Sequence, residues 1–116
     1  KTYVLEGPID AMFLPNAVAT AGGDLRSAQS VVSMEDMVVV YDNERRAPET
    51  VKKMHKAIKS GYRVCFWPEN VLYKDVNDMI KYTNMSGAQI AGVIDENTHS
   101  GLRAEMELSK WKRVNV

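Results

Sequence analysis

Short blocks of consecutive apolar residues alternate along this chain with stretches in which apolar residues recur at helical spacing. The clearest block covers residues 37–41 (MVVVY), and its continuous, β-branched composition predicts a strand covered on both faces. Similar blocks at residues 3–5 and 63–67 predict two more strands, and residues 17–21 form another short apolar run. The pattern therefore places strands at intervals along the whole chain.

The stretches between these blocks are typical of helices. Pro48 suits a first helical turn, Val51, Met54 and Ile58 form an apolar stripe, and Gly61 fits the position after a helix end. Strands separated by helices predict an α/β fold with about four mostly parallel strands and helices on both faces. Further helices are expected at residues 9–14, 25–32, 75–82 and 102–111, whereas residues 90–94 fit either a last strand or a piece of helix.

Composition and charge narrow the class of protein. The 116 residues, 45% hydrophobic and 26% charged, suit a single globular domain over residues 1–116. Fifteen basic residues balance fifteen acidic ones, so any nucleic-acid binding has to be local. The single cysteine, Cys65, excludes an internal disulfide and a multi-cysteine zinc site. Without a signal-peptide pattern or an 18-residue apolar run, we expect no membrane partner and a cytoplasmic location, in the host cytoplasm if the protein is viral. Because the chain opens without Met, we also expect a fragment of a longer protein.

Acidic residues follow the predicted strands. Ligands of parallel α/β sheets gather at the carboxyl ends of the strands, and several carboxylates meeting there repel one another unless a cation neutralises them. Carboxylate oxygens favour Mg²⁺ or Mn²⁺ over zinc. Arg45 and Arg46, in the loop after residues 37–41, suit phosphate contact, and this combination is typical of phosphoryl transfer. The acids concerned are Glu6, Asp42, Glu44, Asp75, Asp78 and, if residues 90–94 form a strand, Asp95 and Glu96.

Most of these residues also have a purely structural interpretation. Asp10, Asp75 and Asp78 suit the first turns of helices, where a carboxylate accepts backbone N–H bonds or favours the helix dipole. Trp67 fits either core packing or stacking on a base, and Gly22-Gly23 either a plain turn or a phosphate cradle.

Other side chains have a structural interpretation by default. Cys65 and the seven methionines are expected in the core. The lysine run predicts a solvated helix face, with a template-binding face as the alternative. Its members are Lys52, Lys53, Lys56 and Lys59.

Three motifs resemble a known family when they are taken in order. Residues 4–10 (VLEGPID) resemble the first motif of Toprim domains, a hydrophobic strand followed by Glu-Gly-x-x-Asp. Residues 37–44 are similar to the second, a strand ending in Asp-x-Asp, with Glu44 as the second acid. Residues 74–78 (KDVND) are similar to the Lys-Asp-x-x-(Asp/Glu) segment of primase-type Toprim domains, and residues 21–25 fit their small-residue turn. The resemblance covers about residues 2–82 and is greatest to the primases of tailed bacteriophages.

This resemblance implies roles for individual residues. Glu6 would be a metal ligand or the general base for an attacking 3′-hydroxyl, and Asp42 and Glu44 would hold the metal. Asp75 would complete the metal site, and Asp10 and Gly7 would support the first motif. The residues expected to bind nucleotide or phosphate are Lys74, Arg45, Arg46 and Asp78; the two arginines replace the small pair that commonly follows the second motif.

The function that the resemblance implies is the catalytic domain of a DNA primase, which uses Mg²⁺ or Mn²⁺ to synthesise RNA primers on a template. Its partners would be a single-stranded DNA template, nucleoside triphosphates and a replicative helicase. The alternatives are another Toprim enzyme, either a nuclease or a topoisomerase, and a non-catalytic interaction module. A receiver-like phosphate-binding domain is disfavoured, because the paired acids expected after the first strand and the later lysine-bearing strand are missing.

Overall fold

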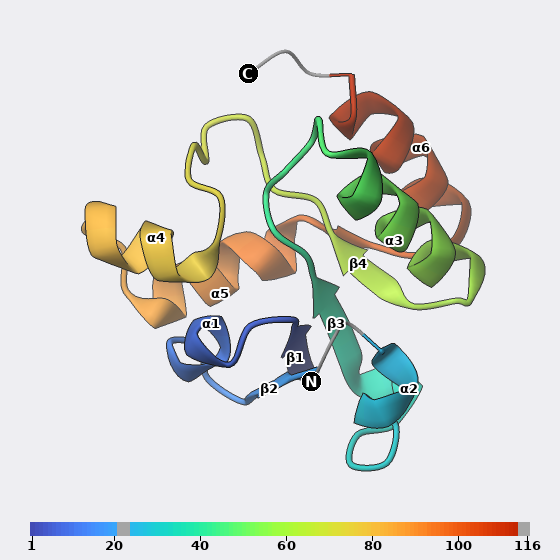
Figure 1. Cartoon of the computed structure of the whole chain (residues 1–116), viewed down its shortest axis with the longest axis horizontal. Helices are drawn as coiled ribbons and strands as arrows, with labels where there is room; N and C mark the ends of the chain where they lie inside the picture. The colour runs from blue at the N-terminus through green and yellow to red at the C-terminus, as the bar shows by residue number, and fades with distance from the viewer. Residues whose placement is uncertain (21–23, 114–116) are drawn as a thin grey trace.

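The computed structural model describes residues 1–20 and 24–113, and its centre is a five-stranded sheet in the order β2-β1-β3-β4-β5 (Figure 1). The strands are β1 (Thr2–Leu5), β2 (Ala17–Ala19), β3 (Met37–Val40), β4 (Arg63–Cys65) and β5 (Thr98–His99). The first four pair in parallel, and β5 joins β4 antiparallel. The α/β prediction is therefore confirmed, with a short fifth strand beyond the expected four. The parallel register brings the carboxyl ends of β1, β3 and β4 to one edge.

Helices cover both faces of the sheet, as predicted. The elements are α1 (Pro8–Met12), α2 (Leu25–Ala28), α3 (Pro48–Lys59), α4 (Val76–Tyr82), α5 (Gly87–Glu96), α6 (Gly101–Trp111) and the 3₁₀ turn η2 (Met34–Asp36). One core cluster joins the sheet to α3 and α6, and the other joins it to α4 and α5. Figure 1 shows α3 and α6 side by side, away from α1, α4 and α5. In β3, Val39 points into the first cluster while Val38 and Val40 point into the second, which explains its continuous apolar sequence.

The segment at residues 90–94 is helical, so the strand alternative is wrong. It lies within α5, which begins at a capping box: the Ser86 hydroxyl accepts the Gln89 N–H, and the Gln89 side chain accepts the Ser86 N–H. Asp95 therefore lies near the end of a helix and not after a strand. Its carboxylate accepts the Tyr3 hydroxyl at 2.8 Å and pairs with the Lys1 ammonium at 2.9 Å.

Several smaller expectations differ in outcome. Gly61 follows α3 with φ +93°, the left-handed conformation that favours glycine after a helix. Cys65 and Trp67 are buried as predicted, but Met12 and Met106 are exposed and are not core residues. The helix expected over residues 25–32 ends at Ala28, and Gly22-Gly23 lies outside the described residues. No helix within the described ranges is both long and apolar enough to cross a membrane.

Candidate metal centre

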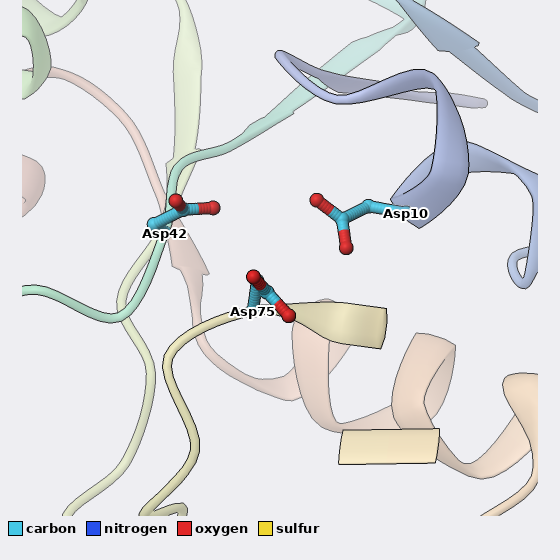
Figure 2. Close-up of side chains that lie close together, drawn as sticks. All are labelled: Asp10, Asp42 and Asp75. Carbon is cyan, nitrogen blue, oxygen red and sulfur yellow. The ribbon is translucent and has the colours of Figure 1, made fainter. Parts of the chain in front are cut away.

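Three aspartates meet at the edge where the parallel strands end. Asp10 comes from α1, Asp42 follows β3, and Asp75 immediately precedes α4. Figure 2 shows their side chains pointing toward one another, and one carboxylate oxygen of each lies within 4.8 Å of those of the other two. The parallel sheet explains this meeting, because the segments that follow β1 and β3 leave it at the same edge.

Asp10 is held in place by its neighbours on both sides. Its Oδ1 accepts the backbone N–H of Asn77 at 2.8 Å, which ties α1 to the first turn of α4. A Cβ atom added at Gly7 would lie only 2.8 Å from Asp10 Oδ2. The missing side chain at Gly7 therefore leaves room for the carboxylate. The sequence assigned Asp10 only a supporting role, whereas the structure places it within the acidic cluster.

Asp75 both caps a helix and belongs to the acidic cluster. It is the N-cap of α4, and its Oδ1 accepts the Asp78 N–H at 2.8 Å. The capping interpretation is therefore confirmed, and the same residue belongs to the acidic cluster. Capping fixes the orientation of this carboxylate at the edge of the cluster.

Asn43 connects two segments of the cluster, and the sequence analysis missed it. Its backbone N–H donates to the Lys74 carbonyl at 2.6 Å, and its side-chain Nδ2 donates to the carbonyls of Val71 at 2.9 Å and Tyr73 at 3.3 Å. Its Oδ1 is buried without a hydrogen-bond partner among the residues described. Asn43 thus holds the loop before Asp75 against the residue that follows Asp42. Its position between two acids was visible in the sequence, but its partners lie about thirty residues further along the chain.

The electrostatics of the cluster favour a cation. Burial, and after it the charges of Asp10, Asp75 and Glu44, together raise the pKa of Asp42 to about 6, against the lowering effect of Lys74. Burial also raises the pKa of Asp10, with the charges of Asp75 and Asp78 acting in the same direction and the Asn77 N–H bond opposing them. A divalent cation would offset this repulsion, and three carboxylates suit the oxygen preference of Mg²⁺ or Mn²⁺.

Two acids predicted to hold metal lie outside this group of three. Glu6 pairs with Lys53 of α3, with 2.8 Å between Oε2 and Nζ. Glu44 acts on the cluster through its charge, as the raised pKa of Asp42 shows. Asp78 acts in the same way on Asp10, and Lys74 lowers the pKa values of both Asp10 and Asp42.

The two arginines after β3 have different surroundings. Arg45 is only 5% exposed: its guanidinium donates to the Trp67 carbonyl and lies 5.2 Å from the centre of the Trp111 ring. Burial lowers the pKa of this guanidinium. Arg46 is exposed. Because the guanidinium of Arg45 is engaged inside the protein, we leave Arg45 out of the nucleotide site, although the sequence placed it there.

The lysine run on α3 is mostly exposed, in agreement with the solvated-face interpretation. Lys53 pairs with Glu6, and Lys59 pairs with Glu105 of α6 at 3.2 Å. Lys53 and Lys56 also line a groove of about 760 Å³ between α2 and α3. The template-binding alternative for this face therefore stays a hypothesis.

A mostly parallel α/β sheet with helices on both faces and acids at the strand ends is consistent with a Toprim-like fold. No protein-family model matches the chain. Over 113 residues, 97% of its length, the chain is 42% identical to the DNA primase of Enterobacteria phage T4, and it spans about a third of that relative. This similarity confirms the predicted resemblance to phage primases and supports a primase-related function.

Proposed function

We propose that this chain forms the metal-binding catalytic domain of a DNA primase, which synthesises RNA primers on a DNA template. The observation that carries the proposal is the convergence of Asp10, Asp42 and Asp75. The similarity to a phage DNA primase supports the choice of reaction. The alternative, a non-catalytic interaction module, does not explain why mutually repelling carboxylates lie together. Such a cluster lowers the stability of the fold unless a cation is bound.

The three aspartates would hold Mg²⁺ or Mn²⁺. The cation, when bound, would neutralise negative charge on the phosphate under attack. Glu44 would strengthen cation binding by adding negative charge beside Asp42. Asn43 and the Asn77 N–H would keep the carboxylates in position as substrate enters and leaves.

The charged residues around the aspartates would handle the substrate. The Lys74 ammonium, whose charge already acts on Asp10 and Asp42, would contact a phosphate of the nucleoside triphosphate. Glu6 would accept the proton of the attacking 3′-hydroxyl, and its ion pair with Lys53 would orient its carboxylate. Arg46 and Asp78 remain candidates for nucleotide contact. A single-stranded DNA template and a replicative helicase would be the partners.

Metal-dependent binding of a nucleoside triphosphate tests the proposal at the step assigned to these residues. We would measure the ³¹P relaxation of a nucleoside triphosphate with Mn²⁺ and the protein present. We expect strong, protein-dependent enhancement with the wild type and a loss of about tenfold or more in affinity with Asp42→Asn, since one carboxylate ligand is removed.

A matched control lies at the opposite end of the same strand. Asp36→Asn makes the same change immediately before β3, where the Asp36 carboxylate accepts the Ser33 hydroxyl, and it should leave the enhancement unchanged. Equal behaviour of the two variants, or no protein-dependent enhancement, would refute the proposal.

A further inference from the structure

Two tyrosine rings stack on each other at the protein surface. The ring centres of Tyr73 and Tyr82 are 5.6 Å apart and their planes differ by 23°. Tyr73 is 36% exposed and Tyr82 is 56% exposed, and Leu72, which precedes Tyr73 in the chain, is 78% exposed. By contrast, Trp67, which the sequence offered as a base-stacking candidate, is 2% exposed and packs inside. Among the residues that the structure describes, the large aromatic side chains in the exposed class are these two tyrosines.

Positive charge accompanies the stacked rings. The Lys81 ammonium lies 5.2 Å from the centre of the Tyr82 ring, and Lys74 follows Tyr73 directly in the chain. We call the four residues Leu72, Tyr73, Lys81 and Tyr82 the stacking surface. Flat rings beside ammonium groups complement a ligand that carries both flat bases and phosphates.

The stacking surface is attached firmly to the acidic cluster. Tyr73 lies two residues before Asp75 in the chain, and its carbonyl accepts a hydrogen bond from the Asn43 side chain. Tyr82 is the last residue of α4, the helix that Asp75 caps. Both rings are therefore carried by the segments on either side of Asp75, so a ligand on this surface would lie on the elements that hold the metal centre.

We propose that the stacking surface binds the bases of single-stranded nucleic acid. The proposal rests on the proposed function, for which it names the surface that receives the strand. A base stacks on an exposed ring face while the Lys81 ammonium, which already lies beside the Tyr82 ring, contacts a neighbouring phosphate. Because every base has a flat π-face, the binding tolerates any sequence.

Fluorescence anisotropy with two oligonucleotides of equal length separates base stacking from charge. One is an ordinary single strand and the other carries abasic positions. The wild type should bind the ordinary strand more tightly. The double variant Tyr73→Ser with Tyr82→Ser should bind it about tenfold more weakly and bind the abasic strand as before.

Two controls identify the cause of such a loss. Tyr73→Phe with Tyr82→Phe keeps both rings and should retain binding, whereas Leu102→Ser changes another exposed apolar residue, on α6, and should have no effect. A thermal melt of each variant establishes that it is folded. Equal binding of ordinary and abasic strands by the wild type, or undiminished binding by the serine variant, would overturn the proposal.

Two further results separate this proposal from its neighbours. If the surface joins copies of the chain instead, the wild type will show a concentration-dependent mass that the serine variant lacks, and the proposal is wrong. Mn²⁺ binding should be the same in the serine variant and the wild type. Base-dependent DNA binding without any Mn²⁺ binding would therefore leave the stacking surface intact and refute only the metal centre.

Discussion

Asp42 and Arg45 lie three residues apart in the loop after β3, yet their charges meet opposite surroundings. Arg45 is buried beside a carbonyl and the face of an indole ring. Asp42 is half-buried among other carboxylates, which raise its pKa together with burial. The positive charge of Arg45 is therefore balanced by groups of the chain itself, whereas the negative charge of Asp42 lies among other negative charges.

Arg45 therefore lies in the part of the loop that supports the fold, whereas Asp42 lies in the part that is suited to bind a cation. Around Arg45 the polar groups are matched: the Trp67 carbonyl also accepts the Trp111 indole N–H at 3.0 Å, and the Trp67 indole N–H donates to the Tyr41 carbonyl at 2.9 Å. Such a network stabilises the chain without any partner. The acidic cluster, by contrast, gathers like charges whose repulsion a bound cation would offset, and such raised pKa values are typical of a functional site.

The largest expected effect is a loss of stability when Arg45 is substituted. Arg45→Met should lower the free energy of unfolding by about 3 kcal/mol, because the Trp67 carbonyl loses a charged donor and Trp111 loses its cation. Urea unfolding measures the change. The adjacent Arg46→Met, at an exposed position, should change stability by less than about 0.5 kcal/mol. Equal effects of the two substitutions would mean that burial of Arg45 does not stabilise the fold.

Asn43 joins the two sides of the comparison, since it is a structural residue placed at the acidic cluster. Asn43→Leu removes both side-chain donors and should cost about 2 kcal/mol of stability, while Mn²⁺ affinity falls because the loop before Asp75 is released. Hydrogen exchange should accelerate at residues 71–75.

Asn97→Leu is the matched control for this substitution. It removes a similar side-chain bond, to the Val93 carbonyl at 2.7 Å. It should lower stability but leave the Mn²⁺ affinity unchanged. A loss of Mn²⁺ affinity in both variants would assign the effect to general destabilisation.

On the acidic side, neutralising a charge should stabilise the metal-free protein. The pKa of Asp42 rises from 3.8 to about 6 on folding, so the native state holds the proton more tightly than the unfolded state. Stability should therefore fall as pH rises from about 4 to about 6.

Asp42→Asn removes this dependence. Because the group is half-exposed, screening reduces the gain at pH 7 to about 1 kcal/mol. The gain should vanish near pH 4. Urea titrations at both pH values in the presence of a chelator measure it, and an equal effect at the two would contradict the electrostatic origin.

The smallest effect concerns the ion pair between Glu6 and Lys53, whose side chains are both substantially exposed. Lys53→Met should change stability by less than about 1 kcal/mol, because exposed pairs contribute little. If Glu6 needs Lys53 for its orientation, nucleotidyl transfer should decline more than stability. The measurement is a comparison of turnover with urea unfolding, and Lys52→Met, beside it on α3, is the control.

Much of this architecture could be predicted from the sequence, because buried strands and helices have characteristic local patterns of apolar residues. The apolar block at residues 37–41 predicted β3, and the acids after it predicted the edge where ligands gather. Residues 90–94 were ambiguous because a short apolar run suits a strand or a helix, although Ser86 and Gln89 carried the spacing of a capping box.

The composition of the cluster depended on contacts between distant segments. Asp10 lies in the cluster because of the orientation of α1 and the hydrogen bond from the Asn77 N–H. Arg45 is buried because its guanidinium donates to the Trp67 carbonyl and lies against the Trp111 ring. Neither outcome is contained in the spacing of charges along the chain. The predicted parallel strands, each followed by acidic residues, indicated that acids would gather at one edge, and the tertiary packing decided which of them meet.

The most direct test is a Mn²⁺ titration of the chain, followed by paramagnetic broadening of its amide resonances. We expect broadening centred on residues near 10, 42 and 75 in the wild type, its loss in the double variant Asp10→Asn with Asp42→Asn, and its retention in Asp36→Asn. Absent broadening at millimolar Mn²⁺, or broadening that survives in the double variant, would contradict the assignment of these three aspartates as a metal centre.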